Sequence, residues 1–160
     1  METARNFYDN LPPPTECLAI LVGCAQLTVF GLGALANPIE YSKGHGLPIT
    51  LASTNTKRQV SEEEGESANE AQKNQIALVS AMAARNIGNG ILILSLACYF
   101  RDRRALGVAV AANAFSALAD TFIVKSFGTE DKASTHITGI IASLGIGSTL
   151  LYWRREDPWW

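Results

Sequence analysis

Residues 76–100 read IALVSAMAARNIGNGILILSLACYF, twenty-five residues that carry a single charge, Arg85. A helix of this length measures roughly 37 Å. The hydrocarbon core of a bilayer is about 30 Å thick, so this stretch is long enough to cross a membrane. The charged turn Arg101–Arg104 ends the apolar run. We therefore predict a transmembrane helix over residues 76–100.

Three further stretches of the chain have the same character. Residues 17–36 carry no charge, residues 105–126 carry Asp120 in their interior, and residues 136–153 are uncharged after His136. A soluble all-α bundle would keep a charged outer face on its helices, and none of these runs has one. The predicted fold is therefore all-α, an integral membrane four-helix bundle in which residues 1–160 form a single membrane domain.

The charged residues gather between and beside these four runs. A net charge of -2 and the lack of a basic stripe argue against a nucleic-acid partner. Residues 53–73 are rich in glutamate and poor in apolar residues, which predicts a flexible, solvated loop. Residues 38–48 alternate glycine, proline and apolar residues, as in a re-entrant or interfacial cap. His45 in this segment either caps a cavity or is solvated, and we favour the solvated state.

Four spans place both termini on one side of the membrane. The tightest connection, residues 101–104, lies on that side and contains three arginines. Short basic loops favour the cytosolic side, so we expect cytosolic termini. We expect an integral membrane protein of the endoplasmic reticulum, surrounded by the lipid bilayer.

Arg85 is the most informative single residue. It lies near the middle of its predicted span, where a lone cation costs roughly 2.5–3.5 kcal/mol on insertion scales and therefore needs a partner. Asp120 is the one acid well inside a predicted span. Because the two helices are antiparallel across the 101–104 turn, both residues lie towards the same side of the membrane. The sequence predicts that Arg85 and Asp120 form an ion pair on facing helices.

Other polar residues extend this cluster. Ionisable groups inside a membrane commonly mark functional sites, and we assign catalytic roles to Arg85, Asp120 and His136. His136 lies near the membrane surface on the same side, where an imidazole can transfer protons near neutral pH. Substrate-binding roles are assigned to three amides: Asn86, Asn89 and Asn113. The alternative is structural: the ion pair fixes helix register, and the asparagines join neighbouring helices.

No motif predicts a bound cofactor or metal. The three cysteines lie inside apolar runs and match no metal-ligand spacing. Gly88-Asn-Gly90 follows no strand, so it is not a phosphate-binding loop; its glycines are expected to let a neighbouring helix approach. We therefore expect no cofactor and no metal.

Several short segments resemble a known protein family. They are Ala84-Arg-Asn-Ile-Gly-Asn-Gly90, Arg103-Arg-Ala-Leu-Gly107, Ala119-Asp-Thr-Phe-Ile-Val124, His136 and the Gly-Leu-Pro of Gly44–Pro48. Together they resemble a domain-of-unknown-function family of small four-helix membrane proteins that is frequent in fungi, and more distantly DoxX-type proteins. The resemblance implies the architecture and no settled reaction. Small membrane proteins of this kind occur beside fungal biosynthetic enzymes, which implies a place in secondary metabolism.

Two classes of function fit these residues. The first is a cofactor-free isomerase or cyclase, a class that includes pericyclases, that acts on a lipophilic small molecule entering from the bilayer. Arg85 would polarise a substrate oxygen, with Asp120 orienting Arg85 or acting as the base. The second is a non-enzymatic scaffold, subunit or carrier of a lipophilic ligand. A roomy apolar cavity touching both charged residues would favour the first class, and a sealed ion pair the second. The oligomeric state is left open.

Overall fold

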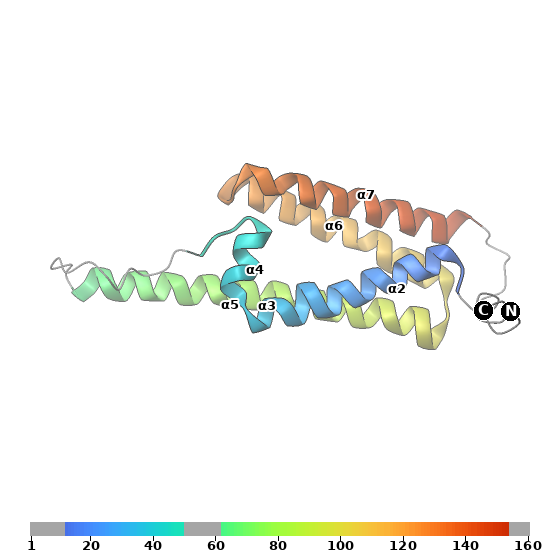
Figure 1. The fold of residues 1–160 in the computed structure, drawn as a ribbon, viewed down its shortest axis with the longest axis horizontal. Helices are drawn as coiled ribbons and strands as arrows, with labels where there is room; N and C mark the ends of the chain where they lie inside the picture. The colour runs from blue at the N-terminus through green and yellow to red at the C-terminus, as the bar shows by residue number, and fades with distance from the viewer. Residues whose placement is uncertain (1–11, 50–61, 154–160) are drawn as a thin grey trace, which may run out of the picture.

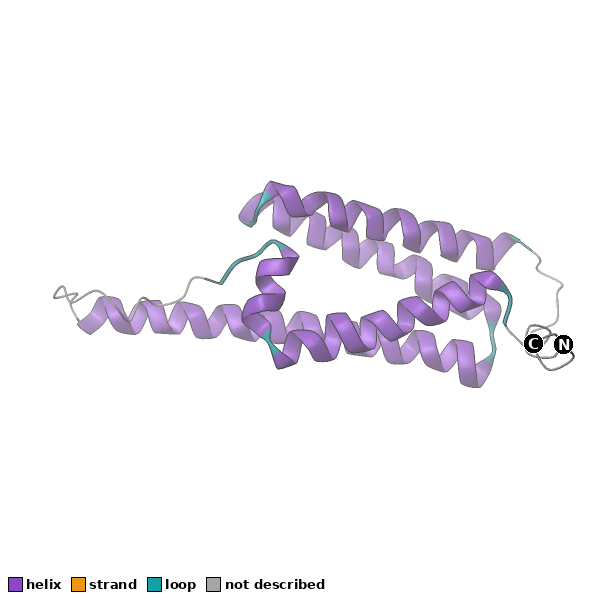
Figure 2. Cartoon of the chain, viewed as in Figure 1, coloured by secondary structure: helices purple, strands orange, loops and turns teal. Residues whose placement is uncertain are grey.

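The computed structural model describes residues 12–49 and 62–153 (Figure 1). Across these ranges the secondary structure is helical and no strand occurs, as Figure 2 shows. In chain order the elements are α2 (Pro14–Leu27), a π-helical segment (Thr28–Leu32), α3 (Gly33–Ala36), α4 (Pro38–His45), α5 (Glu62–Leu94), a second π-helical segment (Ser95–Phe100), α6 (Arg103–Phe127) and α7 (Glu130–Tyr152).

The predicted fold class is confirmed. Four helical stretches are long and apolar enough to cross a membrane: Pro14–Ala36, Asn69–Phe100, Arg103–Phe127 and Ser134–Tyr152. Large apolar side chains on their outer faces are exposed, among them Leu21, Ile91, Phe115 and Ile141. Such a surface suits lipid rather than water. The protein is an all-α integral membrane four-helix bundle.

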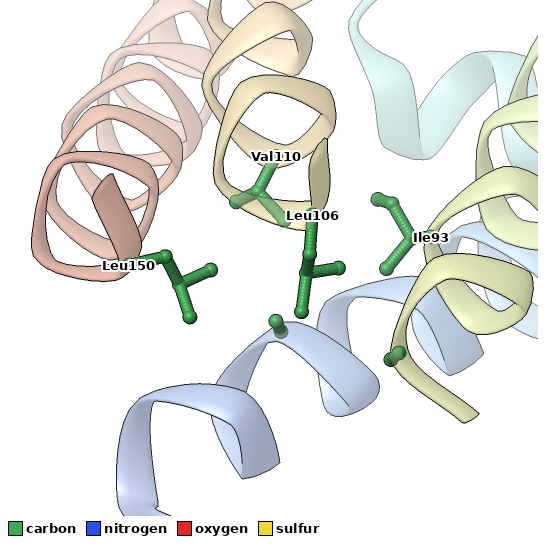
Figure 3. Close-up of a cluster of buried hydrophobic side chains, with 6 residues drawn as sticks. Ile93, Leu106, Val110 and Leu150 are labelled. Atoms are coloured by element: carbon green, nitrogen blue, oxygen red, sulfur yellow. The ribbon is translucent and has the colours of Figure 1, made fainter. Parts of the chain in front are cut away.

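The bundle consists of two antiparallel helix pairs, α2 with α5 and α6 with α7. The pairs come together near the turn that joins α5 to α6 and separate towards their other end (Figure 1). Near that turn, apolar side chains from all four helices form the buried core shown in Figure 3. Its members are Ala19, Ile93, Ala97, Leu106, Val110 and Leu150.

Glycines allow the helices within each pair to approach closely. A Cβ added to Gly90 of α5 would lie 2.7 Å from the backbone nitrogen of Leu27 and 2.9 Å from the carbonyl oxygen of Gly23 in α2. In the other pair, a Cβ on Gly147 would lie 2.9 Å from the carbonyl oxygen of Gly107. Close contact between small residues is how membrane helices associate without a hydrophobic driving force. The expected helix approach is present at Gly90, whereas Gly88 has no atom within 4 Å of an added Cβ.

A buried ion pair between Glu16 and Arg103 joins α2 to α6 near the closed end of the bundle, where the two helix pairs come together. Arg103 Nε lies 3.1 Å from Glu16 Oε1, and the Glu16 side chain is 1% exposed. Arg103 also donates a hydrogen bond to the carbonyl of Trp153 at the end of α7. Because this arginine begins α6 and contacts the start of α2 and the end of α7, it fixes the relative register of the three helices at one membrane surface.

At the open end, the short helix α4 lies between the two helix pairs (Figure 1). The side chain of Asn37 caps its first turn by accepting from the Glu40 N–H. Gly46 ends it with a φ of 93°, a left-handed conformation that favours glycine. The Gly46 carbonyl then accepts a hydrogen bond of 3.0 Å from the N–H of Thr129, in the turn between α6 and α7. This bond anchors the end of α4, and with it His45, to the second helix pair.

The predicted flexible loop over residues 53–73 differs from the structure where it can be compared. Residues 62–73 are helical and form the first turns of α5, whereas residues 53–61 lie outside the described ranges. Glutamate, glutamine, alanine and lysine are good helix formers, and acidic residues stabilise a helix N-terminus. Low apolar content therefore indicated solvation here but not the absence of a helix. Figure 1 shows this part of α5 extending past the ends of α6 and α7.

Alanine substitutions at two glycines of α5 test how closely α2 and α5 pack. Gly90→Ala should lower the thermal unfolding midpoint in detergent, because overpacking against the α2 backbone costs about 1–3 kcal/mol. Gly88→Ala is the matched control; its methyl group meets nothing within 4 Å, so the midpoint should be unchanged or higher. Equal midpoints for the two variants would contradict the close approach of α2 and α5 at Gly90.

Candidate functional site

The predicted ion pair forms the centre of a polar cluster. Arg85 Nη2 lies 2.9 Å from Asp120 Oδ2, and both terminal nitrogens of Arg85 lie 3.2 Å from Asp120 Oδ1. Asp120 precedes the end of α6 by seven residues, which is roughly 10 Å along the helix. The Asp120 side chain is 8% exposed, whereas that of Arg85 is 34% exposed. The carboxylate is therefore enclosed, while the guanidinium still borders open space.

Two histidines lie near the Asp120 carboxylate, His45 next to it and His136 in contact with His45. His45 Nε2 lies 3.8 Å from Asp120 Oδ2. The His45 and His136 rings are in edge contact with centroids 4.4 Å apart, and His136 Nε2 lies 3.2 Å from the His45 carbonyl oxygen. Our preference for a solvated His45 is wrong, since its side chain is only 12% exposed. The reason is the path of α4, which carries His45 into the space between the helix pairs.

Asn86 connects the cluster to α4 and to the first span. Its amide nitrogen donates to the Phe30 carbonyl at 3.1 Å and to the Tyr41 hydroxyl at 3.4 Å. Phe30 lies in the π-helical segment, where the helical hydrogen-bond ladder is irregular. Tyr41 in turn stacks on His45, with ring centroids 5.4 Å apart. Sequence analysis overlooked Tyr41, although its i, i+4 spacing to His45 places both rings on one face of a helix.

Asn89 and Asn113 form a separate bridge deeper in the bundle, about one turn from Arg85 on α5 and two turns from Asp120 on α6. The Asn89 amide nitrogen donates to Asn113 Oδ1 at 3.0 Å, joining α5 to α6. Asn113 is 6% exposed, and its own amide nitrogen has no hydrogen-bond partner among the described residues. A buried amide donor without a partner is costly, so this group is available to a bound molecule or water.

A polar pocket of about 140 Å³ collects most of these side chains. Of the predicted site residues, Arg85, Asp120, Asn86 and Asn113 line it, whereas Asn89 and His136 do not. His136 lies behind the pocket, in contact with His45. The remaining lining residues come from α2 and its π-helical extension, α4, α6 and α7: Gln26, Phe30, Tyr41, His45, Ser116, Ala117, Gly139 and Ser143.

Burial keeps the two aromatic groups of α4 uncharged. The pKa of His45 is lowered to about 4, chiefly by burial and next by the neighbouring His136, while Asp120 opposes the shift. Burial also raises the pKa of the Tyr41 hydroxyl. At neutral pH His45 is thus a neutral imidazole with an available nitrogen lone pair, and Tyr41 is a neutral hydroxyl.

A larger apolar cavity of about 390 Å³ lies beside α5 and α6, next to the polar pocket along these helices. Met82 of α5 is three residues before Arg85, and Ile123 of α6 is three residues after Asp120. The cavity is therefore one helical turn from the ion pair, towards the open end of the bundle. The other lining residues are Leu47, Pro48, Ile49, Gln75, Leu78, Val79 and Phe127.

Comparison with known families agrees with the resemblance drawn from the sequence. Residues 24–150 match the family described as Domain of unknown function (DUF4267). The chain belongs to this family. The DUF4267 match begins within α2 and ends within α7, so it contains every site residue described above. No curated protein and no solved structure shows a significant match to the chain. The DUF4267 description assigns no reaction, so the function rests on the geometry of the site.

Proposed function

We propose that the protein is a membrane enzyme that isomerises or cyclises a lipophilic small molecule bearing a carbonyl or acid group. The observation that supports this most is the open side of Arg85. Its side chain is 34% exposed and lines the polar pocket, although three contacts hold it to Asp120. The pair is therefore not sealed, and a substrate oxygen in the pocket can approach the guanidinium.

The two cavities suggest how such a molecule binds. The apolar cavity of about 390 Å³ falls within the size range of small-molecule sites, roughly 300–1,000 Å³. It accepts the apolar body of the substrate. The oxygen-bearing end then reaches the polar pocket one helical turn deeper, beside Arg85 and the amide nitrogen of Asn113, which has no hydrogen-bond partner among the described residues.

The chemistry proposed for this site is redox-neutral. Arg85 donates hydrogen bonds to the substrate oxygen and stabilises the negative charge that develops there, an effect that low polarity strengthens. Asp120 orients Arg85 or acts as the base. In a double-bond shift, a C–H bond beside the carbonyl breaks, the base takes the proton, and a C–H bond forms at another carbon of the same molecule. In a cyclisation, the cavity holds the reactive conformer while π bonds are exchanged for ring bonds.

A second function is favoured by the closeness of the ion pair. The carboxylate is almost fully enclosed and accepts three contacts from Arg85, as expected of a pair that fixes helix register. Neither charged residue lines the apolar cavity. On this alternative the protein is a scaffold, subunit or carrier that holds a lipophilic molecule without converting it.

Metabolite profiling of a strain lacking the gene separates the two functions. An isomerase or cyclase adds and removes no atoms, so the compound that accumulates should have the same elemental composition as the compound that disappears. High-resolution mass spectrometry checks this identity. Loss of many unrelated metabolites, or accumulation of none, would contradict the enzyme and favour the scaffold or carrier.

Complementation of that strain then tests Arg85. Arg85→Leu leaves Asp120 unpaired, and the lone acid is expected to take up a proton. The double variant Arg85→Leu with Asp120→Leu removes both charges, and replacing a buried pair by apolar side chains often costs little stability. We expect the double variant to recover the wild-type thermal midpoint while product formation stays below about 1% of wild type. An active double variant would rule out catalysis by Arg85.

Filling the apolar cavity tests the binding mode. Met82→Trp places a large side chain in the cavity one turn from the ion pair and should reduce product formation at least tenfold, because the substrate body no longer fits. Ile141→Trp is the matched control, since Ile141 is 67% exposed on the outer face of α7. Equal activity of the two variants would show that the substrate does not use this cavity.

The membrane and orientation of the protein are part of the proposal. We propose a place in the endoplasmic reticulum and in secondary metabolism, with cytosolic termini on the side of the Arg101–Arg104 turn. Protease treatment of sealed microsomes should remove a tag at either terminus. Protection of both tags from the protease would contradict this orientation and place the termini in the lumen.

A further inference from the structure

Three potential metal ligands converge from three different helices. His45 ends α4, Asp120 lies in α6, and His136 lies near the start of α7. One ligand atom from each residue can be chosen so that all three atoms lie within 4.8 Å of one another. Two imidazoles and one carboxylate are a common ligand set for zinc, iron and other divalent first-row metals. The three residues are separated by 75 and 16 positions in the chain, so no sequence spacing indicates the set.

The distance between His45 and Asp120 fits a shared cation better than a direct hydrogen bond. His45 Nε2 and Asp120 Oδ2 are 3.8 Å apart, too far for a hydrogen bond. Two ligands of one tetrahedral ion, each about 2.0–2.2 Å from it, are separated by roughly 3.3–3.6 Å. His45 Nε2 is also buried without a hydrogen-bond partner among the described residues. A buried polar nitrogen of this kind requires a partner, and a bound ion is one that proteins commonly use.

The surrounding groups resemble the outer shell of a metal site. A ligating carboxylate is usually held by a further hydrogen bond, and Arg85 supplies it. An ionised carboxylate has about four lone-pair positions, so three contacts with Arg85 leave one for an ion. The contact between His136 Nε2 and the His45 carbonyl orients the second ring, as backbone carbonyls do for metal-bound histidines.

The net charge of the site restricts which further ligand can bind the ion. Asp120 and Arg85 together are neutral, so a divalent ion adds two positive charges in a region of low dielectric constant. An anionic ligand offsets this cost. His45 and Asp120 both line the polar pocket, which provides an open coordination position for hydroxide or for an acidic oxygen of a substrate. Three protein ligands with one open position are the pattern of catalytic metal sites.

We propose that His45, Asp120 and His136 bind one divalent transition-metal ion, with Arg85 holding the carboxylate and the polar pocket supplying the open coordination position. This site does not depend on the proposed isomerase or cyclase activity. With the ion bound, Asp120 is a ligand, so of the two roles proposed for it in that activity only the orientation of Arg85 remains. A bound ion joins α4 to α6 and α7 and so fixes the short helix between the two helix pairs. It also places a Lewis acid beside the guanidinium of Arg85.

Direct titration of the full-length protein in detergent tests the site. Metal-depleted wild type should bind Zn²⁺ with one site per chain by calorimetry, and Co²⁺ should give the visible absorption of a four- or five-coordinate ion with nitrogen ligands. His45→Phe and His136→Phe remove one ligand each but retain an aromatic ring. Each should weaken Zn²⁺ binding at least 100-fold, because one of three protein ligands is lost. Wild type without the Co²⁺ absorption overturns the proposal.

Controls separate this site from other ways of binding metal. Cys24 and Cys98 are exposed, so Cys24→Ser with Cys98→Ser should leave Zn²⁺ affinity and the Co²⁺ spectrum unchanged. Binding that persists in the double variant His45→Phe with His136→Phe, or that disappears in the cysteine variant, contradicts the assignment. If a histidine variant does not fold, the wild-type Co²⁺ spectrum alone decides. Metal titration measures no turnover, so its outcome is independent of the Arg85 complementation test.

Discussion

A guanidinium group in the interior of a membrane helix has to meet an anion, and much of this structure follows from that requirement. Arg85 and Asp120 lie on consecutive antiparallel helices at similar depth, and their contact joins the α2–α5 pair to the α6–α7 pair at the end where the pairs separate. The apolar core joins them at the other end. The apolar core and the Glu16–Arg103 pair at one end, and the Arg85–Asp120 pair towards the other, thus hold the pairs together and leave room between them.

The short helix α4 occupies that room, and its position depends on a few backbone features. The left-handed Gly46 turns the chain out of α4, and its carbonyl accepts from the N–H of Thr129. Gly128 permits this contact, since a Cβ there would lie 2.2 Å from the Gly46 carbonyl oxygen. These glycines therefore position His45 and Tyr41, although neither glycine has a side chain that could take part in chemistry. Substitution at either glycine would displace the histidine from the carboxylate.

The sequence predicted the features that depend on the number of residues between positions on a helix. Helix length and charge placement defined four spans, and antiparallel geometry brought Arg85 to Asp120. The position of His45 could not be predicted in this way, because it depends on where α4 packs in three dimensions. The Glu16–Arg103 pair was overlooked for a related reason. Glu16 lies at the edge of an apolar run, where a charge is expected to be solvated, yet beside Arg103 of α6 its side chain is only 1% exposed. Among the predicted amides, Asn86 and Asn113 line the pocket, while Asn89 is directed to its partner on α6.

The order of the two cavities limits which molecules suit the protein. Along α5 and α6 the apolar cavity lies nearer the open end of the bundle, and the polar pocket lies one turn deeper. A phospholipid has the opposite arrangement, with its polar head at the membrane surface and its chains in the interior. Placing such a head beside Arg85 would bury a large hydrated group within the bundle, which is costly. A compact molecule with one oxygen-bearing end and a rigid apolar body has no such cost, because its single polar group meets Arg85 and its body fills the apolar cavity. The order of the two cavities therefore supports the proposed substrate class, small lipophilic acids and carbonyl compounds, over ordinary membrane lipids.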